Sequence, residues 1–212
     1  MADALLLPFA GFRREREIIG KILIAYGEME HVLLDMLIAV LGDGQAAIRT
    51  MYQLRSESNR IAVAEAIITP WFERAKLGGQ LKEGLDALNH CKNIRNNFAH
   101  CIWVSDDGIL RFGNLETTAK SKGEKCQLVT HPLTLALLRK QWAYFEYAHH
   151  VLLWVGQQFR DKNQQPQAGP LISKPRRVAP PSLHSRGETR IRLSLAVGSW
   201  RFQPTPRPNP LP

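Results

Sequence analysis

Apolar residues recur every three or four positions along most of the first 160 residues, which is the spacing of one face of an α-helix. The longest such run covers residues 13–41 and stops at the glycine-containing stretch 42–44, which favours a helix C-terminus. The apolar face of this helix is wide. It comprises Ile19, Ile22, Leu23, Tyr26, Met29, Leu33, Met36, Leu37, Val40 and Leu41.

The same spacing predicts further helices over residues 45–54, 61–75, 80–99 and 132–160. Pro70 is expected to kink the helix over 61–75 or to separate its last turn, because proline lacks the backbone N–H that a helix interior needs. Thr130 and Pro132 are typical of a helix start, with threonine as the cap and proline in the first turn. The last helix is apolar on two faces, as in a bundle core or a dimer interface.

A different pattern separates the last two helices. Two short apolar runs, 101–104 and 109–112, flank the dipeptide Asp107-Gly108, which is typical of a β-hairpin turn. Residues 126–129 can add a third short strand. The sequence therefore predicts a mainly all-α fold, a four- to five-helix bundle with a small β-hairpin inserted before the last long helix.

The positive charge is concentrated after residue 160. The chain has a net charge of +9, and its last 52 residues carry nine Lys and Arg against two acids, together with ten of the 13 prolines. Such a composition is typical of disorder, so we predict a helical domain over 1–160 and a disordered, basic, Pro-rich C-terminal tail over 161–212. Residues 189–195 alternate in polarity and are the one segment of this tail where a weak strand is expected.

Three cysteines without a CxxC spacing indicate a reducing compartment, and hence a cytoplasmic protein, instead of a disulfide framework or a zinc site. No run of 18 uncharged apolar residues is present, so no membrane segment is predicted. The short apolar start is followed, not preceded, by arginines, which is the wrong order for a secretory signal.

The candidate chemistry lies in residues 93–100, at the end of the fourth predicted helix. This stretch contains Arg95, Asn96 and His100. An always-charged guanidinium near an imidazole that titrates close to neutrality suits phosphate chemistry. The guanidinium can bind a phosphodiester and stabilise its transition state, while the imidazole can move a proton to or from a ribose oxygen. This chemistry requires no metal, and no acidic cluster suited to one is evident.

Residues 95–100 resemble the Arg-x4–6-His motif of the HEPN domain superfamily, with a polar residue, here Asn96, directly after the arginine. The resemblance implies a helical domain whose two motifs face each other in a homodimer. It also implies a metal-independent endoribonuclease, often a toxin with an antitoxin partner or a phage-defence effector, in which Arg95 and His100 are catalytic and Asn96 assists. No cofactor is implied, and the expected substrate is RNA.

One residue departs from a toxin subgroup of that family. The subgroup has a tyrosine two positions after the histidine, which its antitoxin modifies, whereas this chain has Ile102. Neutralisation by modification at that position is therefore not expected. Many HEPN-like domains are non-catalytic modules that bind RNA or a protein partner, so such a module is the alternative function.

The geometry of the motif leaves two arrangements open. Five residues of a straight helix turn through about 140°, so Arg95 and His100 would point in different directions. They can converge if the helix ends or loosens between them, or if a second copy supplies His100. In the structural alternative, Arg95 only forms a buried ion pair, His100 caps the helix C-terminus and Asn96 ends the helix.

Glu30 interrupts the apolar face of the first helix. A carboxylate there is costly unless it is paired or reaches water at the edge of the face. We expect either that edge position or an ion pair with Arg95 that supports the site. His149 and His150 are adjacent and so point to different helix faces, which favours a core or interface role over a metal site. The basic tail would favour RNA or another polyanion without sequence preference, or is simply a solvated extension.

Overall fold

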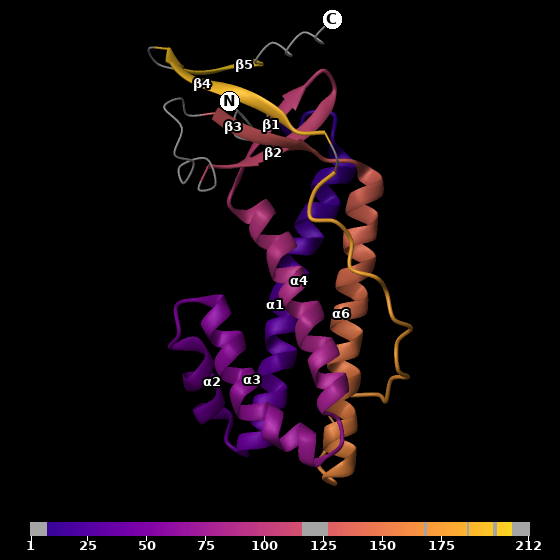
Figure 1. The fold of residues 1–212 in the computed structure, drawn as a ribbon. Helices are drawn as coiled ribbons and strands as arrows, with labels where there is room; N and C mark the ends of the chain where they lie inside the picture. Colours follow the sequence, from indigo (N-terminus) through magenta and orange to yellow (C-terminus); the bar gives the residue numbers. More distant parts are fainter. Residues whose placement is uncertain (1–7, 116–126, 168, 186, 197–198, 205–212) are drawn as a thin grey trace, which may run out of the picture. The chain divides into compact units, whose positions relative to one another are not determined.

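The computed structural model describes residues 8–115, 127–167, 169–185, 187–196 and 199–204. Five α-helices lie within these residues: α1 (Arg13–Leu41), α2 (Gly44–Tyr52), α3 (Glu57–Arg74), α4 (Gly78–Ala99) and α6 (Leu135–Lys162) (Figure 1). The described strands are β1 (Cys101–Asp106), β2 (Ile109–Asn114), β3 (Gln127–Pro132), β4 (Thr189–Ala196) and β5 (Ser199–Pro204). The predicted fold class is confirmed: the chain is mainly helical, and antiparallel strands precede the last long helix.

The chain forms two compact units, and α1, α4 and α6 each contribute residues to both. The helical unit comprises Lys21–Asn93 and Gln141–Pro181. The sheet unit comprises Met1–Gly20, Ile94–Lys140 and Ser182–Pro212. Residues behind 160 are thus shared between the units, and the division into a domain of residues 1–160 and a separate tail stays a prediction.

The core of the helical unit is built from the apolar faces that the sequence pattern indicates. Leu33 of α1, Ile68 of α3 and Leu88 of α4 are fully buried. Phe72 of α3 and Phe159 of α6 stack with their ring centroids 4.3 Å apart. Burying a large apolar side chain contributes roughly 1.5–3 kcal/mol, so these faces hold the helices together.

Pro70 does not divide α3, which runs without a break to Arg74. The missing proline N–H would have bonded the carbonyl of Ala66, and both residues are exposed, so water can bind that carbonyl. Arg74 Nε donates to the Pro70 carbonyl at 3.1 Å and supports the last turn. The predicted separation of the last turn is therefore wrong, whereas the alternative, a kink at Pro70, stays a prediction.

The strands form one antiparallel sheet in the order β1-β2-β3-β4-β5. β1 and β2 form the predicted hairpin, in which Asp106 pairs with Ile109. Asp107 and Gly108 form its turn with φ of 47° and 71°, the left-handed pair that matches the twist of a two-residue hairpin. The first strand of this hairpin, β1, begins directly after His100. The motif therefore lies at the junction between α4 and β1.

The helix start predicted at Thr130 is wrong. Thr130 and Pro132 belong to β3, and α6 begins at Leu135, where the Thr134 hydroxyl accepts from the Leu137 N–H at 3.2 Å. The buried Thr130 instead donates its hydroxyl to the Thr189 carbonyl of β4 at 3.1 Å. Strand pairing thus uses the hydroxyl that a local pattern would assign to a helix cap.

The tail contributes the last two strands. The alternating segment 189–195 lies in β4, which pairs with β3 so that Thr130 faces Thr189. β5, which no pattern in the sequence indicates, pairs with β4. The third predicted strand is β3, although Cys126 at its predicted start lies outside the described residues.

Gly113 of β2 lies against β3 so closely that a larger residue should not fit. A Cβ atom at this position would lie 2.7 Å from the Val129 carbonyl oxygen and 3.0 Å from the Leu128 side chain. We expect Gly113→Ala to lower the free energy of unfolding by about 1–3 kcal/mol, because strand β3 would have to move. Urea unfolding followed by circular dichroism would measure this change.

Gly27→Ala in α1 is the matched control, because nothing lies within 4 Å of a Cβ at that exposed helical position. It is expected to raise the free energy of unfolding by roughly 0.5–1 kcal/mol through helix propensity. Changes of the same sign in the two variants would contradict the close approach at Gly113.

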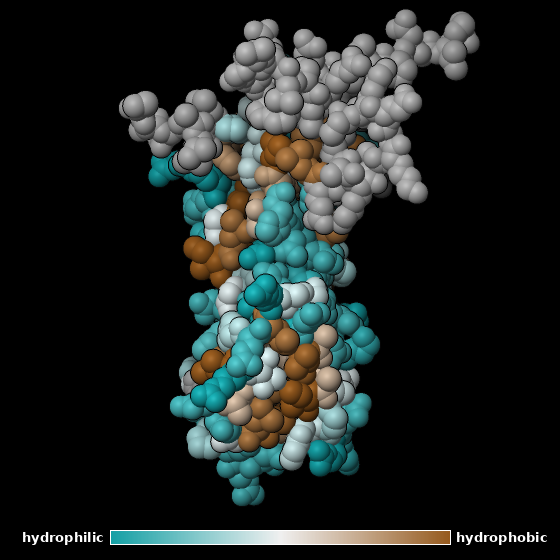
Figure 2. Space-filling view, turned by 90° about the vertical axis from the view of Figure 1, so that its left-hand side faces the viewer, coloured by the Kyte–Doolittle hydropathy of each residue, from teal (hydrophilic) through white to brown (hydrophobic). Residues whose placement is uncertain are grey.

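Hydrophobic residues gather on the side of the helical unit that Figure 2 faces, where brown residues lie among hydrophilic ones. Exposed large side chains of this unit include Ile48 and Tyr52 of α2, which are 49% and 48% exposed. A contiguous exposed apolar area is typical of an association surface. None of the described helices is both long enough and apolar enough to cross a membrane.

Candidate active site

The candidate site begins in the last turn of α4. Arg95 and Asn96 are half-buried within the helix, and His100 is exposed directly behind its last residue, Ala99. The His100 N–H still donates to the Asn96 carbonyl at 3.3 Å, so the backbone follows the helical path up to His100. The helix therefore ends at the histidine and not between it and the arginine.

Arg95 and Asn96 are brought together. Arg95 Nη1 donates to Asn96 Oδ1 at 2.9 Å, which fixes one edge of the guanidinium. A guanidinium has five N–H donors in a rigid fork, so the bond to the Asn96 amide oxygen holds the whole fork in one orientation. Asn96 is thus placed to orient Arg95, and its assisting role stays a prediction.

His100 is not brought to Arg95 within one chain. The helical path gives their Cα–Cβ bonds a difference of about 140° around the axis. The His100 imidazole makes no hydrogen bond, ion pair or ring contact with the part of the chain that the structure describes. The His100 side chain is exposed. Of the two arrangements considered from the sequence, this helical path favours completion of the site by a second copy.

An aromatic cluster anchors the motif in the sheet unit. Phe98, between Asn96 and His100 in the chain, is 3% exposed. Its ring lies 5.8 Å from Trp103 of β1 and 5.5 Å, edge to face, from Phe112 of β2. Phe9 packs on the Trp103 ring at 4.9 Å. Trp103 is thus part of the packing that fixes the end of α4.

The cysteines beside the motif are not suited to nucleophilic chemistry. Burial raises the pKa of the Cys101 thiol to about 12, and burial also raises the pKa of Cys91 far above its usual value. The thiolate is the reactive form of cysteine, so both thiols stay protonated at neutral pH. Cys101 instead donates to the Phe98 carbonyl across 3.5 Å.

Glu30 is 8% exposed and lies close to a cation that the sequence analysis missed. Its Oε1 atom is 3.6 Å from Nε of Arg60 in α3, and the Arg60 guanidinium also lies 5.5 Å from the centre of the Tyr52 ring. The signal was present, because Arg60 precedes the buried Ala64 and Ile68 by four and eight residues and so falls on an apolar face.

The pairing of Glu30 with Arg95 stays a prediction, because the two residues belong to different units. A double-mutant cycle with Glu30→Gln and Arg95→Gln would measure it. A coupling free energy near zero would reject the pair.

His131 of β3 and His184 form a second group of titratable side chains in the sheet unit. Their rings stack 4.1 Å apart, and His131 Nδ1 is buried without a hydrogen-bond partner among the described residues. Burial, His184 and Arg111 lower the pKa of His131, and Glu188 partly opposes them.

The folded protein therefore binds a proton at His131 less readily than the unfolded chain, whose histidine pKa is about 6.5. As the pH falls through 6.5 towards the lowered folded pKa, the unfolded state gains the proton first, and the free energy of unfolding decreases. We expect urea unfolding at pH 5.5 to show lower stability than at pH 7.5, with a smaller loss in His131→Phe. His31→Phe on the exposed surface of α1 is the control and should lose as much stability between these pH values as the wild type. An equal loss of stability in the wild type and in His131→Phe would contradict the prediction.

His149 and His150 are adjacent histidines of α6 whose rings lie near each other. Their ring centroids are 6.0 Å apart, and burial together with His150 lowers the pKa of His149. Within the described ranges, no three side chains of His, Cys, Asp or Glu lie close enough to hold a metal ion.

Comparison with known proteins adds no relative. No protein family matches the chain, and neither a curated protein nor a solved structure is significantly similar to it.

Proposed function

We propose that the protein is a metal-independent endoribonuclease of the HEPN type, active as a homodimer. The observation that carries this proposal is the pairing of Arg95 with Asn96 one turn before an exposed His100. An oriented guanidinium and a free imidazole at one helix end are the two groups that RNA transesterification needs.

In the proposed reaction, Arg95 binds the non-bridging oxygens of the scissile phosphodiester and stabilises the additional charge of the pentavalent transition state. Asn96 keeps the guanidinium in place. His100 either takes the proton from the 2′-hydroxyl, which attacks the phosphorus, or protonates the 5′-oxygen as its bond to phosphorus breaks, and water completes the other proton transfer. The products are a 2′,3′-cyclic phosphate and a 5′-hydroxyl.

The proposal includes a second subunit because Arg95 and His100 of one chain point in different directions around the helix axis. A two-fold axis places identical surfaces against each other, so His100 of one protomer can approach Arg95 of the other. The exposed apolar residues of the helical unit, Ile48 and Tyr52 among them, are consistent with self-association. Dimerisation can be measured by sedimentation.

The test is incubation of the purified protein with single-stranded RNA in EDTA. We expect cleavage that leaves cyclic phosphate ends, and no cleavage of the all-deoxy oligonucleotide, which lacks the attacking hydroxyl. Loss of activity with the chelator, or cleavage of the deoxy substrate, would reject the mechanism.

The resemblance extends the proposal to a cytoplasmic toxin or phage-defence effector held inactive by an antitoxin protein. Expression of the wild type should then arrest growth, whereas a cleavage-deficient variant should not. Stable RNA binding without turnover in EDTA would instead favour the alternative, a non-catalytic helical module that binds RNA or a partner.

A further inference from the structure

The segment behind α6 forms an ordered strap along the helical unit. The strap is residues 166–181, except residue 168, which the structure does not describe (Figure 1). The Gln157 side chain of α6 holds it twice: its amide Nε2 donates to the Pro170 carbonyl at 2.8 Å, and its Oε1 accepts from the Ile172 N–H at 3.0 Å. The Gln157 carbonyl also accepts from Gln167 Nε2 at 3.2 Å. This part of the chain was predicted to be disordered, yet it has a fixed path antiparallel to α6.

The far end of the strap lies against α4. His90 Nε2 and the Pro181 carbonyl are 2.8 Å apart, and Arg177 Nε lies 3.9 Å from Glu83 Oε1. The Glu83 carboxylate also accepts from the Tyr147 hydroxyl of α6 at 2.7 Å. The strap therefore covers a groove between α4 and α6 that these polar side chains line.

The cations of the strap are open to solvent, although Lys174 Nζ also lies 5.2 Å from the centre of the Trp154 ring of α6. Lys174, Arg176 and Arg177 are all exposed, and the Arg177 side chain is 83% exposed. Pro175 fixes its own φ and keeps Lys174 extended, so the spacing of the charges varies little. No acidic residue lies between 162 and 187 in the sequence, so the strap offers a row of positive charge on a stiff backbone.

The pair between Arg177 and Glu83 does not neutralise the strap. The Arg177 side chain is 83% exposed and lies 3.9 Å from the partly buried Glu83 carboxylate, so this long pair is worth little and a phosphate can replace the carboxylate as the partner of Arg177. Phosphate contacts position a nucleic acid without reading its sequence, and exposed cations on an ordered segment can make such contacts.

We propose that the strap is a secondary RNA-binding surface, on which Lys174, Arg176 and Arg177 contact backbone phosphates outside the cleavage site. The choice of RNA as the polyanion rests on the proposed function. The surface binds without base preference, because only charge and backbone spacing are recognised.

The expected effect follows from counterion release. Each phosphate contact on a single strand contributes about 0.7 to the slope of log affinity against log salt. The double variant Arg176→Gln with Arg177→Gln should therefore reduce the slope by about 1.4. If wild type and variant bind equally at 1 M salt, the variant should bind roughly 25-fold more weakly than the wild type at 0.1 M salt.

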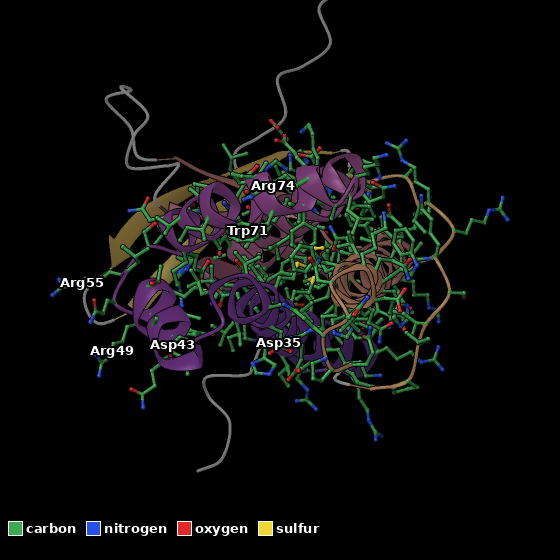
Figure 3. The ribbon with its side chains drawn as sticks, turned by 90° about the horizontal axis from the view of Figure 1, so that it is seen from below. Asp35, Asp43, Arg49, Arg55, Trp71 and Arg74 are labelled. Carbon is green, nitrogen blue, oxygen red and sulfur yellow. The ribbon has the colours of Figure 1, made fainter. Side chains whose placement is uncertain are left out.

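The probe is a single-stranded 2′-O-methyl oligonucleotide, which cannot be cleaved through a 2′-hydroxyl, and fluorescence anisotropy between 50 and 300 mM NaCl gives the slope. Arg49→Gln with Arg55→Gln is the matched control: both arginines are exposed, extend from the α2 side of the helical unit, and lie away from the strap (Figures 1 and 3). The control removes the same charge and should change the slope much less.

Glu83→Gln is a second test variant, and it is expected to change the oligonucleotide affinity in the opposite direction. It keeps an acceptor for Tyr147 but releases Arg177, so affinity should rise several-fold at low salt. Glu65→Gln on exposed α3 surface should have a smaller effect, because it has no partner on the strap.

Equal slopes for the strap and control double variants would overturn the proposal. So would a strap double variant that loses affinity for phosphatidylglycerol vesicles while its oligonucleotide binding is unchanged. Because the probe is uncleavable, the result is independent of the nuclease proposal. If binding depends on the strap but RNA is not cleaved, the strap proposal holds and the nuclease proposal is rejected. If RNA is cleaved but the slopes are equal, the nuclease proposal holds and the strap proposal is rejected.

Discussion

His100→Ala is expected to slow RNA cleavage by about 10²–10⁴-fold, the usual contribution of a positioned general acid or base. The fold should be unaffected, because His100 is exposed after the end of α4 and its imidazole makes no hydrogen bond, ion pair or ring contact with the described residues. Substitutions at such surface positions usually change stability by less than about 0.5 kcal/mol. Single-turnover cleavage in EDTA and thermal unfolding would measure the two quantities.

His31→Ala is the matched control, because His31 is also an exposed histidine on a helix. It should leave the rate unchanged. A His100→Ala enzyme that cuts RNA as fast as the wild type would remove the histidine from the mechanism and with it the proposed reaction.

Mixing two inactive variants tests whether the site spans two chains. A heterodimer of His100→Ala and Arg95→Ala protomers contains one site with both groups and one site with neither. Equal mixing should therefore restore about a quarter of the wild-type activity if subunits exchange randomly. No restoration, with heterodimers shown to form, would place both groups of each site in a single chain.

Phe98→Ala is expected to lower the free energy of unfolding by about 3–5 kcal/mol, the usual cost of removing a buried aromatic ring. Phe98 is 3% exposed and its ring lies against Trp103 and Phe112, so the truncated side chain would leave a cavity in the sheet unit. The end of α4 would lose its anchor, and the motif residues on either side would lose their fixed positions. Urea unfolding would measure the loss.

Phe98→Leu keeps most of the apolar volume and should cost clearly less than the alanine substitution. Cleavage by the leucine variant, measured well below its melting temperature, should be weaker than wild type but present. A loss below about 1 kcal/mol in Phe98→Ala would mean that the aromatic cluster does not fix the motif.

The helices could be predicted because their apolar faces repeat over many turns. The three- and four-residue spacing in α1 gave both of its ends correctly, Arg13 and Leu41. The start of α6 could not be predicted, because Thr130 and Pro132 carry a local helix signal that pairing with β4 overrides. Such pairing joins residues 59 positions apart, which no local pattern contains.

The same distinction applies to the candidate site. Arg95, Asn96 and His100 lie in one short stretch, so their spacing made them visible, and the contact of Arg95 with Asn96 connects neighbours. Arg60 was missed because its relation to Glu30 exists only after α1 and α3 pack. The strap was missed because its prolines and charges are typical of disorder, while the glutamine that holds it gives no signal of its own.

The pairing of β3 with β4 has a consequence for shortened forms of the protein. β3 shares four register positions with β4 but only two with β2. A chain cut after residue 181 would leave the backbone N–H and C=O groups of β3 unpaired on that side. Open strand edges of this kind recruit strands from other molecules, so a protein shortened to remove its basic end should aggregate more readily than the full chain.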